Sequence, residues 1–303
     1  MIGRPARGAA LVLVLWLIVL LTAVVGGYVL TARTGGLQGR VELRQLQGDA
    51  AARAGIEYAM WRLNHPDPAL RWHPDGRAYP WQYGEAAVEV RITDERGRVD
   101  LNHAPQPLLQ ALLEVLGTDP DRAAMLSARI VDWRDPDGVA GPDGAETPAY
   151  AAAGRRYGAK DAPFETVDEL LQVLGVEPSD HQRLRPYVTV HSGLARPEAA
   201  FAALPVLEAL QLPGAGELVE LRARDDGGSD ASLTASESVS PARRLLRIAE
   251  GGAYRRGTYS IDSLVRLPDG SRTRTRAVVT PRGTGVPGMG YMVLAWEEGA
   301  SPQ

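Results

Sequence analysis

Residues 9–32 read AALVLVLWLIVLLTAVVGGYVLTA, a run of 24 residues without a charged side chain. A helix of this length extends roughly 36 Å, since each residue adds about 1.5 Å, and the apolar core of a bilayer is about 30 Å thick. The apolar region of a cleaved secretory signal is shorter, at about 7–15 residues. The run therefore predicts a transmembrane helix over residues 9–32.

The segment before this run, MIGRPARG, carries two arginines and no acid. Arg4 and Arg7 predict a cytoplasmic N-terminus, because positive residues are enriched on that side of the membrane. The rest of the chain would then lie in the periplasm of a Gram-negative cell. A plain single-pass anchor fits this pattern. The segment also resembles a prepilin leader of residues 1–8, which prepilin peptidase cleaves between Gly8 and Ala9.

The residues after the apolar run predict a stem helix over residues 33–64. Gly35 and Gly36 are expected to loosen its start, and Pro66 and Pro68 to end it. Apolar residues keep approximate helical spacing within VELRQLQGDAAARAGIEYAMWRLN, at Leu43, Leu46, Ala50, Ile56, Met60 and Leu63.

Strand patterns lie on both sides of a long helical region. AAVEVRI at 86–92 and segments 243–251, 254–267, 271–280 and 290–296 read as strands, and DERGR at 94–98 as a turn. Helices are expected at 105–116, 119–133, 167–174, 178–188, 197–210 and 217–224. The fold class is therefore α+β, with β segments at 65–99 and 241–303, an inserted α-helical domain at 100–225, and a linker or loop at 226–240 (DGGSDASLTASESVS).

An acidic loop follows one of these helices. Five acids lie within 15 residues, with Arg134 as the only base: Asp132, Asp135, Asp137, Asp143 and Glu146. Three nearby glycines let the backbone turn tightly, so that several oxygens can converge on a cation such as calcium. The spacing is not that of an EF-hand. A solvated acidic loop without metal is the alternative.

Other features limit the function classes. The chain has 303 residues, a formal net charge of −4 and no cysteine. LQLPGAGELVELRAR at 210–224 resembles a helix-hairpin-helix motif, which binds nucleic-acid phosphate, but Glu217 and Glu220 follow its glycine turn and oppose that role. The five histidines lack metal-ligand spacing, and no nucleophile or phosphate-binding motif occurs, so we expect neither an enzyme nor a nucleic-acid-binding protein.

Five local sequences resemble the protein K family of minor pseudopilins in the type II secretion system. They are RG at 7–8, AGIEYAMWRLN at 54–64, ITDERGRVDLNHAP at 92–105, IVDWRDPDG at 130–138 and FETVDELLQVLGV at 164–176. Pilins usually carry a glutamate at the fifth mature position, whereas this chain has Leu13 there. Protein K characteristically lacks that glutamate, so the departure fits the family.

The resemblance implies a pilin-like stem and sheet interrupted by a SAM-like helical domain. It also implies a single-pass inner-membrane protein at the tip of a periplasmic pseudopilus, with structural calcium in the acidic loop. Prepilin peptidase would process and methylate the N-terminus, and the partners would be other minor pseudopilins and secreted proteins. The alternatives are a membrane-tethered DNA-binding protein that uses the hairpins, and a calcium-dependent surface enzyme.

Overall fold

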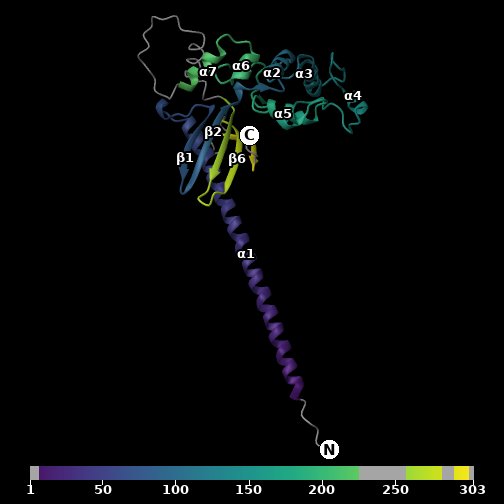
Figure 1. The fold of residues 1–303 in the computed structure, drawn as a ribbon. Helices are drawn as coiled ribbons and strands as arrows, with labels where there is room; N and C mark the ends of the chain where they lie inside the picture. The colour runs from purple at the N-terminus through teal and green to yellow at the C-terminus, as the bar shows by residue number, and fades with distance from the viewer. Residues whose placement is uncertain (1–6, 225–256, 282–289, 300–303) are drawn as a thin grey trace, which may run out of the picture.

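The computed structural model describes residues 7–224, 257–281 and 290–299. One long helix leads from the N-terminus into a five-stranded antiparallel sheet, and a group of short helices lies at the far end of the sheet (Figure 1). The α+β class is thereby confirmed.

The N-terminal helix α1, Arg7–Leu63, is continuous over 57 residues. The expectation that Gly35 and Gly36 loosen it is wrong. A glycine costs a helix about 1 kcal/mol relative to alanine, but unlike proline it keeps the backbone N–H that the helix needs. The helix ends before Pro66 and Pro68, as predicted. Among residues whose side chains the structure describes, no helix is both long enough and apolar enough to cross a membrane.

The sheet has the strand order β1-β2-β5-β6-β7, with every neighbouring pair antiparallel. Its strands are β1 (Asp75–Tyr83), β2 (Ala86–Asp94), β5 (Tyr259–Arg266), β6 (Arg272–Thr280) and β7 (Met292–Glu298). Four of them confirm predicted strands, with shifted ends. The strand predicted at 243–251 lies outside the described residues.

Strand β1 was not predicted, because it lies at the edge of the sheet and buries none of its residues fully. It therefore lacks the apolar alternation that marks β2, and it contains Pro80, which an edge strand tolerates. The predicted turn at 94–98 is a short 3-10 helix, Glu95–Gly97, where the Asp94 side chain accepts a hydrogen bond from the Arg96 N–H.

The C-terminal part of α1 packs on the sheet and forms the first of two apolar cores. Within the described part of the chain, the residues of this core come from 51–92 and 259–296. Alternate residues of β2 are buried against the helix, including Val88, Val90 and Ile92. A Cβ on Gly55 would collide with the Ser263 hydroxyl, so glycine permits the close approach of helix and sheet.

The second core lies within the chain segment that connects β2 to β5, two strands that are neighbours in the sheet. Its helices are α2 (Gln106–Val115), α3 (Pro120–Arg134), α4 (Thr147–Ala152), α5 (Pro178–Leu184), α6 (Leu204–Ala209) and α7 (Ala215–Arg224), with a 3-10 helix at Val167–Gln172. Two short strands of this segment, β3 (Val99–Asp100) and β4 (Val188–Thr189), pair in parallel with each other.

Most predicted helices of this segment are confirmed, with three differences. The helix expected at 178–188 stops at Leu184, because Val188 and Thr189 pair with β3. The helix expected at 197–210 shortens to α6. Helix α4 was not predicted, because its six residues are too few to show helical spacing.

Asp180 joins α5 to α3 through a buried ion-pair network. Its side chain is 1% exposed and accepts from Arg122 at 2.7 Å on each oxygen, from Arg183 at 2.8 Å and from the Glu177 N–H at 3.0 Å. The Arg122 guanidinium, with these other donors, holds the pKa of Asp180 below its ordinary value.

Replacing Asp180 with asparagine is expected to lower the free energy of unfolding by about 2 kcal/mol, since a buried carboxylate that accepts from two arginines loses its charge. Denaturant unfolding of the chain in detergent measures this, with the exposed Asp121→Asn as a control that stays within about 0.5 kcal/mol. Because the folded pKa is lowered, the carboxylate's contribution is present above its ordinary pKa of about 3.9 and is lost as the pH falls through the folded value. A loss below 0.5 kcal/mol for Asp180→Asn would contradict this role.

Candidate metal centre

The acidic loop connects the end of α3 to the start of α4. Asp135 is the C-cap of α3, and Glu146 is the N-cap of α4. The two helix ends therefore place one carboxylate at the start of the loop and one at its end. Asp137 lies between them, where its side chain accepts from the Val139 N–H at 2.9 Å and turns the backbone. The local fold thus returns the chain on itself.

Three of the five predicted acids meet in space. Ligand oxygens of Asp135, Asp137 and Glu146 all lie within 4.8 Å of one another. One oxygen of Asp135 and one of Glu146 are buried without a hydrogen-bond partner among the described residues. Buried carboxylate oxygens without donors are costly, and a bound cation would satisfy them. The residues present therefore fit calcium.

The other two predicted ligands are not grouped with these three. Asp132 is buried, and its Oδ2 accepts from the Gly141 N–H at 3.2 Å. A Cβ on Gly144 would overlap the Asp132 carboxylate, so glycine is needed where the loop passes this side chain. Asp143 is exposed and adopts a left-handed backbone with φ of 64°. Asp132 thus shapes the loop, and its charge also helps to raise the pKa values of Glu146 and Asp135.

Asp161 is an acid of the site that sequence reasoning missed. Its charge helps to raise the pKa values of both Glu146 and Asp135, which places it near the three grouped carboxylates. The segment that carries it folds back against α4, since a Cβ on Gly158 would collide with Thr147. Asp161 lies outside the contiguous acidic loop, so no spacing in the sequence links it to the other acids. Its backbone is left-handed, a conformation that aspartate tolerates.

The carboxylates repel one another in this arrangement. Burial, with the charges of Asp161, Asp132 and the other acids, raises the pKa of Glu146 to about 7. Burial together with Asp137 and Asp132 also raises the pKa of Asp135. A cation would remove this repulsion, because opposite charge favours the ionised form of a carboxyl group.

The basic residues nearest the cluster in sequence bind groups outside the cluster. Arg134 donates to the carbonyl oxygens of Leu101 and Ala104, and burial lowers its pKa. Lys160 pairs with Glu169 at 2.8 Å and with Glu165 at 3.3 Å. The cluster therefore keeps an excess of negative charge, as a cation site requires.

The predicted processing site lies at the N-terminal end of α1. Gly8 and Ala9 are within the first turn of that helix, and the preceding residues 1–6 lie outside the described part of the chain. Cleavage between these two residues stays a prediction.

Comparison with known proteins identifies the segment that carries the acidic loop. Residues 91–193 match the family model described as type II secretion system (T2SS), protein K. A type II secretion system protein K of Pectobacterium carotovorum subsp. carotovorum is 31% identical over 207 residues, which are 60% of this chain and 62% of that protein. A protein of the same name from Klebsiella pneumoniae is 32% identical over 136 residues, 41% of this chain and 42% of its own.

A third relative, from Pseudomonas aeruginosa, has the same name and is 32% identical over 151 residues, 46% of this chain and 45% of its own. The matched parts thus span less than two thirds of each relative. The fold resembles a chain in the crystal structure of the GspK-GspI-GspJ complex from the enterotoxigenic Escherichia coli type 2 secretion system. That likeness has a TM-score of 0.57 at 17% identity and covers 87% of this chain and 99% of the other.

None of these relatives supports the DNA-binding alternative. The family model matches residues 91–193, which include α2 to α5 and the acidic loop, and the likeness in fold to the solved chain covers 87% of this chain. Over residues 91–193 the chain is similar to the type II secretion system protein K family.

Proposed function

We propose that the protein is a minor pseudopilin of the type II secretion system. It would cap the tip of a periplasmic pseudopilus and take part in protein secretion across the outer membrane. The observation that carries this proposal is the match of residues 91–193 to protein K. The solved complex that contains a chain of the same fold joins three proteins, which supports other minor pseudopilins as partners. The test is recovery of such pseudopilins with the tagged chain.

The capping role rests on the arrangement of the two cores. In a pilin-like subunit, the long helix and the sheet packed on it would form the repeating part of the filament. The helices between β2 and β5 extend beyond the end of the sheet, away from the N-terminus (Figure 1). As an inserted domain there, they would obstruct a further subunit above. Leu13 supports the same role, because the tip subunit needs no carboxylate to pair with a neighbour above.

The proposed anchor is the N-terminal part of α1, in a single pass through the inner membrane. Between Leu11 and Val25, every large apolar side chain that is described is at least 55% exposed. A helix that is apolar on all sides needs an apolar environment, which lipid or neighbouring anchor helices would supply. The sheet and the helical segment would then lie in the periplasm.

We expect prepilin peptidase to cleave between Gly8 and Ala9, leaving the apolar helix on the mature protein. Replacing Gly8 with leucine should leave the leader attached, whereas Gly3→Leu, earlier in the leader, should not. N-terminal sequencing of the membrane-extracted protein distinguishes the two. A mature chain that begins at Met1, or after residue 32, would rule out this processing.

The acidic loop would hold a structural calcium ion through Asp135, Asp137 and Glu146, with Asp161 beside them. Carboxylate oxygens are the ligands that calcium prefers, and the ion would tie the end of α3 to the start of α4. In this role the metal supplies no catalysis. It would stabilise the segment that makes the protein a cap.

A further inference from the structure

Two arginines flank the turn that joins β5 to β6 and lie directly opposite each other. Arg266 is the last residue of β5, and its partner in the antiparallel register is Arg272, the first residue of β6. Their neighbours Val265 and Thr273 face α1, since Val265 belongs to the first core and a Cβ on Gly48 of α1 would collide with Thr273. Successive side chains of a strand point to opposite faces, so both arginines project from the sheet face that α1 leaves open.

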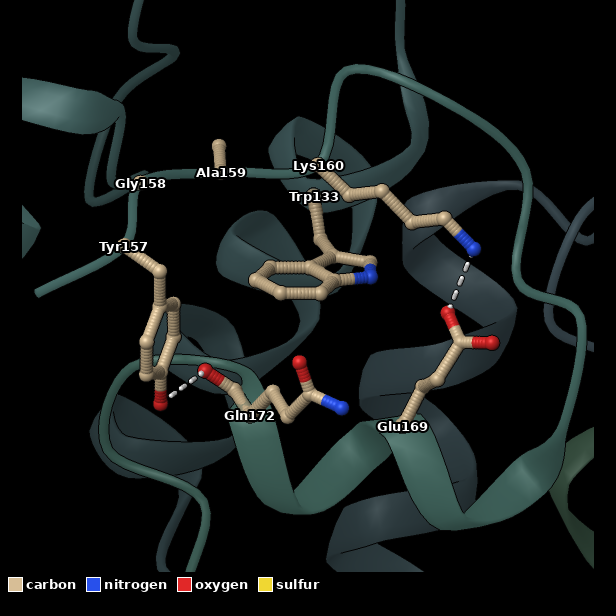
Figure 2. A pocket seen from close by; sticks show the side chains of 7 residues that line it. All are labelled: Trp133, Tyr157, Gly158, Ala159, Lys160, Glu169 and Gln172. Carbon is tan, nitrogen blue, oxygen red and sulfur yellow. Dashed lines mark hydrogen bonds and ion pairs between the residues drawn. The ribbon is translucent and has the colours of Figure 1, made fainter.

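The two arginines repel each other without a compensating acid. Both are exposed, and neither forms an ion pair with any residue that the structure describes. Figure 2 shows the contrasting arrangement in the helical segment, where Lys160 reaches Glu169 at 2.8 Å. Like charges directly opposite each other destabilise a pair of strands. An anion supplied by another molecule would remove this repulsion.

Acids close to the pair bind other groups. Asp269, within the turn, accepts from Arg44 of α1 at 2.9 Å and from the Ser271 hydroxyl at 2.6 Å. On the open face of the sheet, Asp262 pairs with Arg274 at 2.8 Å. The open face therefore keeps an excess of positive charge at this turn.

The position of the turn limits where an anion can come from. The turn lies at the end of the sheet nearest to the N-terminal half of α1, where Asp269 contacts Arg44 (Figure 1). If the membrane span ends at Ala32, as proposed, the continuous helix places Arg44 about 18 Å above the apolar core of the bilayer. Lipid headgroups extend only about 5–8 Å beyond that core, so lipid phosphates do not reach the pair. A protein domain that stands beside the stem does lie within reach.

We propose that Arg266 and Arg272 dock carboxylate groups on the periplasmic domain of a neighbouring minor pseudopilin. The inference rests on the proposed function, because a tip subunit has its neighbours on the side of the sheet where this turn lies. Guanidinium groups bind carboxylates through paired, charge-assisted hydrogen bonds, so two adjacent arginines fit an acidic partner surface. Complementary charges of this kind fix the register of an interface and suppress wrong partners. The arginines would thus select the subunit that stacks beneath the cap.

The experiment compares charge variants for the recovery of minor pseudopilins. The tagged full chain and its variants are produced in a host strain that lacks the gene, extracted from membranes in mild detergent at low salt, and captured. Arg266→Glu combined with Arg272→Glu should lower the recovery of at least one minor pseudopilin about tenfold, since like charges would meet across the interface. Arg155→Glu combined with Arg156→Glu makes the same change of charge at an exposed place in the helical segment, and should leave the recovery unchanged.

A single substitution separates lost docking from lost folding. Arg272→Glu creates an opposite-charge pair with Arg266, so the melting temperature of the chain should stay the same or rise while the recovery falls. Recovery of no minor pseudopilin with the wild type would overturn the proposed function and this inference with it. Equal recovery with the wild type and the double variant would overturn this inference alone. A lower melting temperature for Arg272→Glu would also overturn it, because the arginines would then serve a contact within the chain.

Discussion

Calcium is expected to raise the free energy of unfolding of the wild-type chain by about 2.7 kcal/mol at a free concentration one hundred times the dissociation constant. Glu146→Gln should abolish this gain. The reason lies in the grouping of Asp135, Asp137 and Glu146, whose oxygens lie within 4.8 Å of one another. Asp135 and Glu146 each present a buried oxygen that has no hydrogen-bond partner in the described part of the chain and that the ion would satisfy.

The same substitution should act in the opposite direction without metal. In chelator, Glu146→Gln removes one of several mutually repelling carboxylates, so the variant should be at least as stable as the wild type. A purely structural loss of packing would instead destabilise the variant in both conditions. The sign of the effect therefore separates a metal ligand from a side chain that only fills space.

Calorimetry in calcium and in chelator measures both effects, and elemental analysis reports bound metal. Asp143→Asn is the matched control, because Asp143 is exposed and lies outside the group, and it should keep the calcium response. Asp161→Asn should weaken binding, because Asp161 acts on the group from outside the loop. An unchanged melting temperature, together with no bound metal in the wild type, would rule out the calcium site.

Excising the helical segment is expected to abolish secretion while leaving the sheet folded. Asp94 at the end of β2 lies directly opposite Tyr259 at the start of β5, so a two-residue Asn-Gly turn can join them and replace residues 95–258. Among the residues that the structure describes, none of that segment belongs to the core between α1 and the sheet, so the packing of this core should survive. The shortened chain would retain the helix and sheet but lose the bulk that stops growth.

In a strain that lacks the gene, the full chain should restore secretion and the shortened chain should not. The shortened chain should also give longer pseudopili. Proteolysis of membranes checks that its sheet is folded, and Asp121→Asn in the full chain is a control for expression. Normal secretion with the shortened chain would show that the helical segment is not the functional cap.

Much of the fold could be predicted from the sequence, because long helices and strongly alternating strands have a recognisable pattern of apolar residues. The buried face of β2 repeats every second residue, and Asp119 and Pro120 mark the start of α3. Strand β1 was missed because its burial comes from the neighbouring strand and aromatic contacts, as where Trp81 stacks on Tyr58 of α1 at 4.6 Å. Such contacts produce no periodic pattern of apolar residues in the sequence.

The candidate metal centre was predictable only in part, for a related reason. Asp135, Asp137 and Glu146 lie close in sequence, and two helix ends bring them together. Asp161 joins them because the chain returns past α4, which local spacing cannot show. Asp132, also predicted as a ligand, lies outside the group of three, and its Oδ2 accepts from the Gly141 N–H of the loop.

The central proposal is that this chain, which is similar to protein K, assembles with other minor pseudopilins, and co-purification from its own host tests this proposal most directly. The full chain with a C-terminal tag is extracted from membranes in mild detergent, captured, and examined by size exclusion and mass spectrometry. We predict that two or more minor pseudopilins elute with it in fixed ratio. Recovery of the chain alone, from membranes that contain those pseudopilins, would contradict the account.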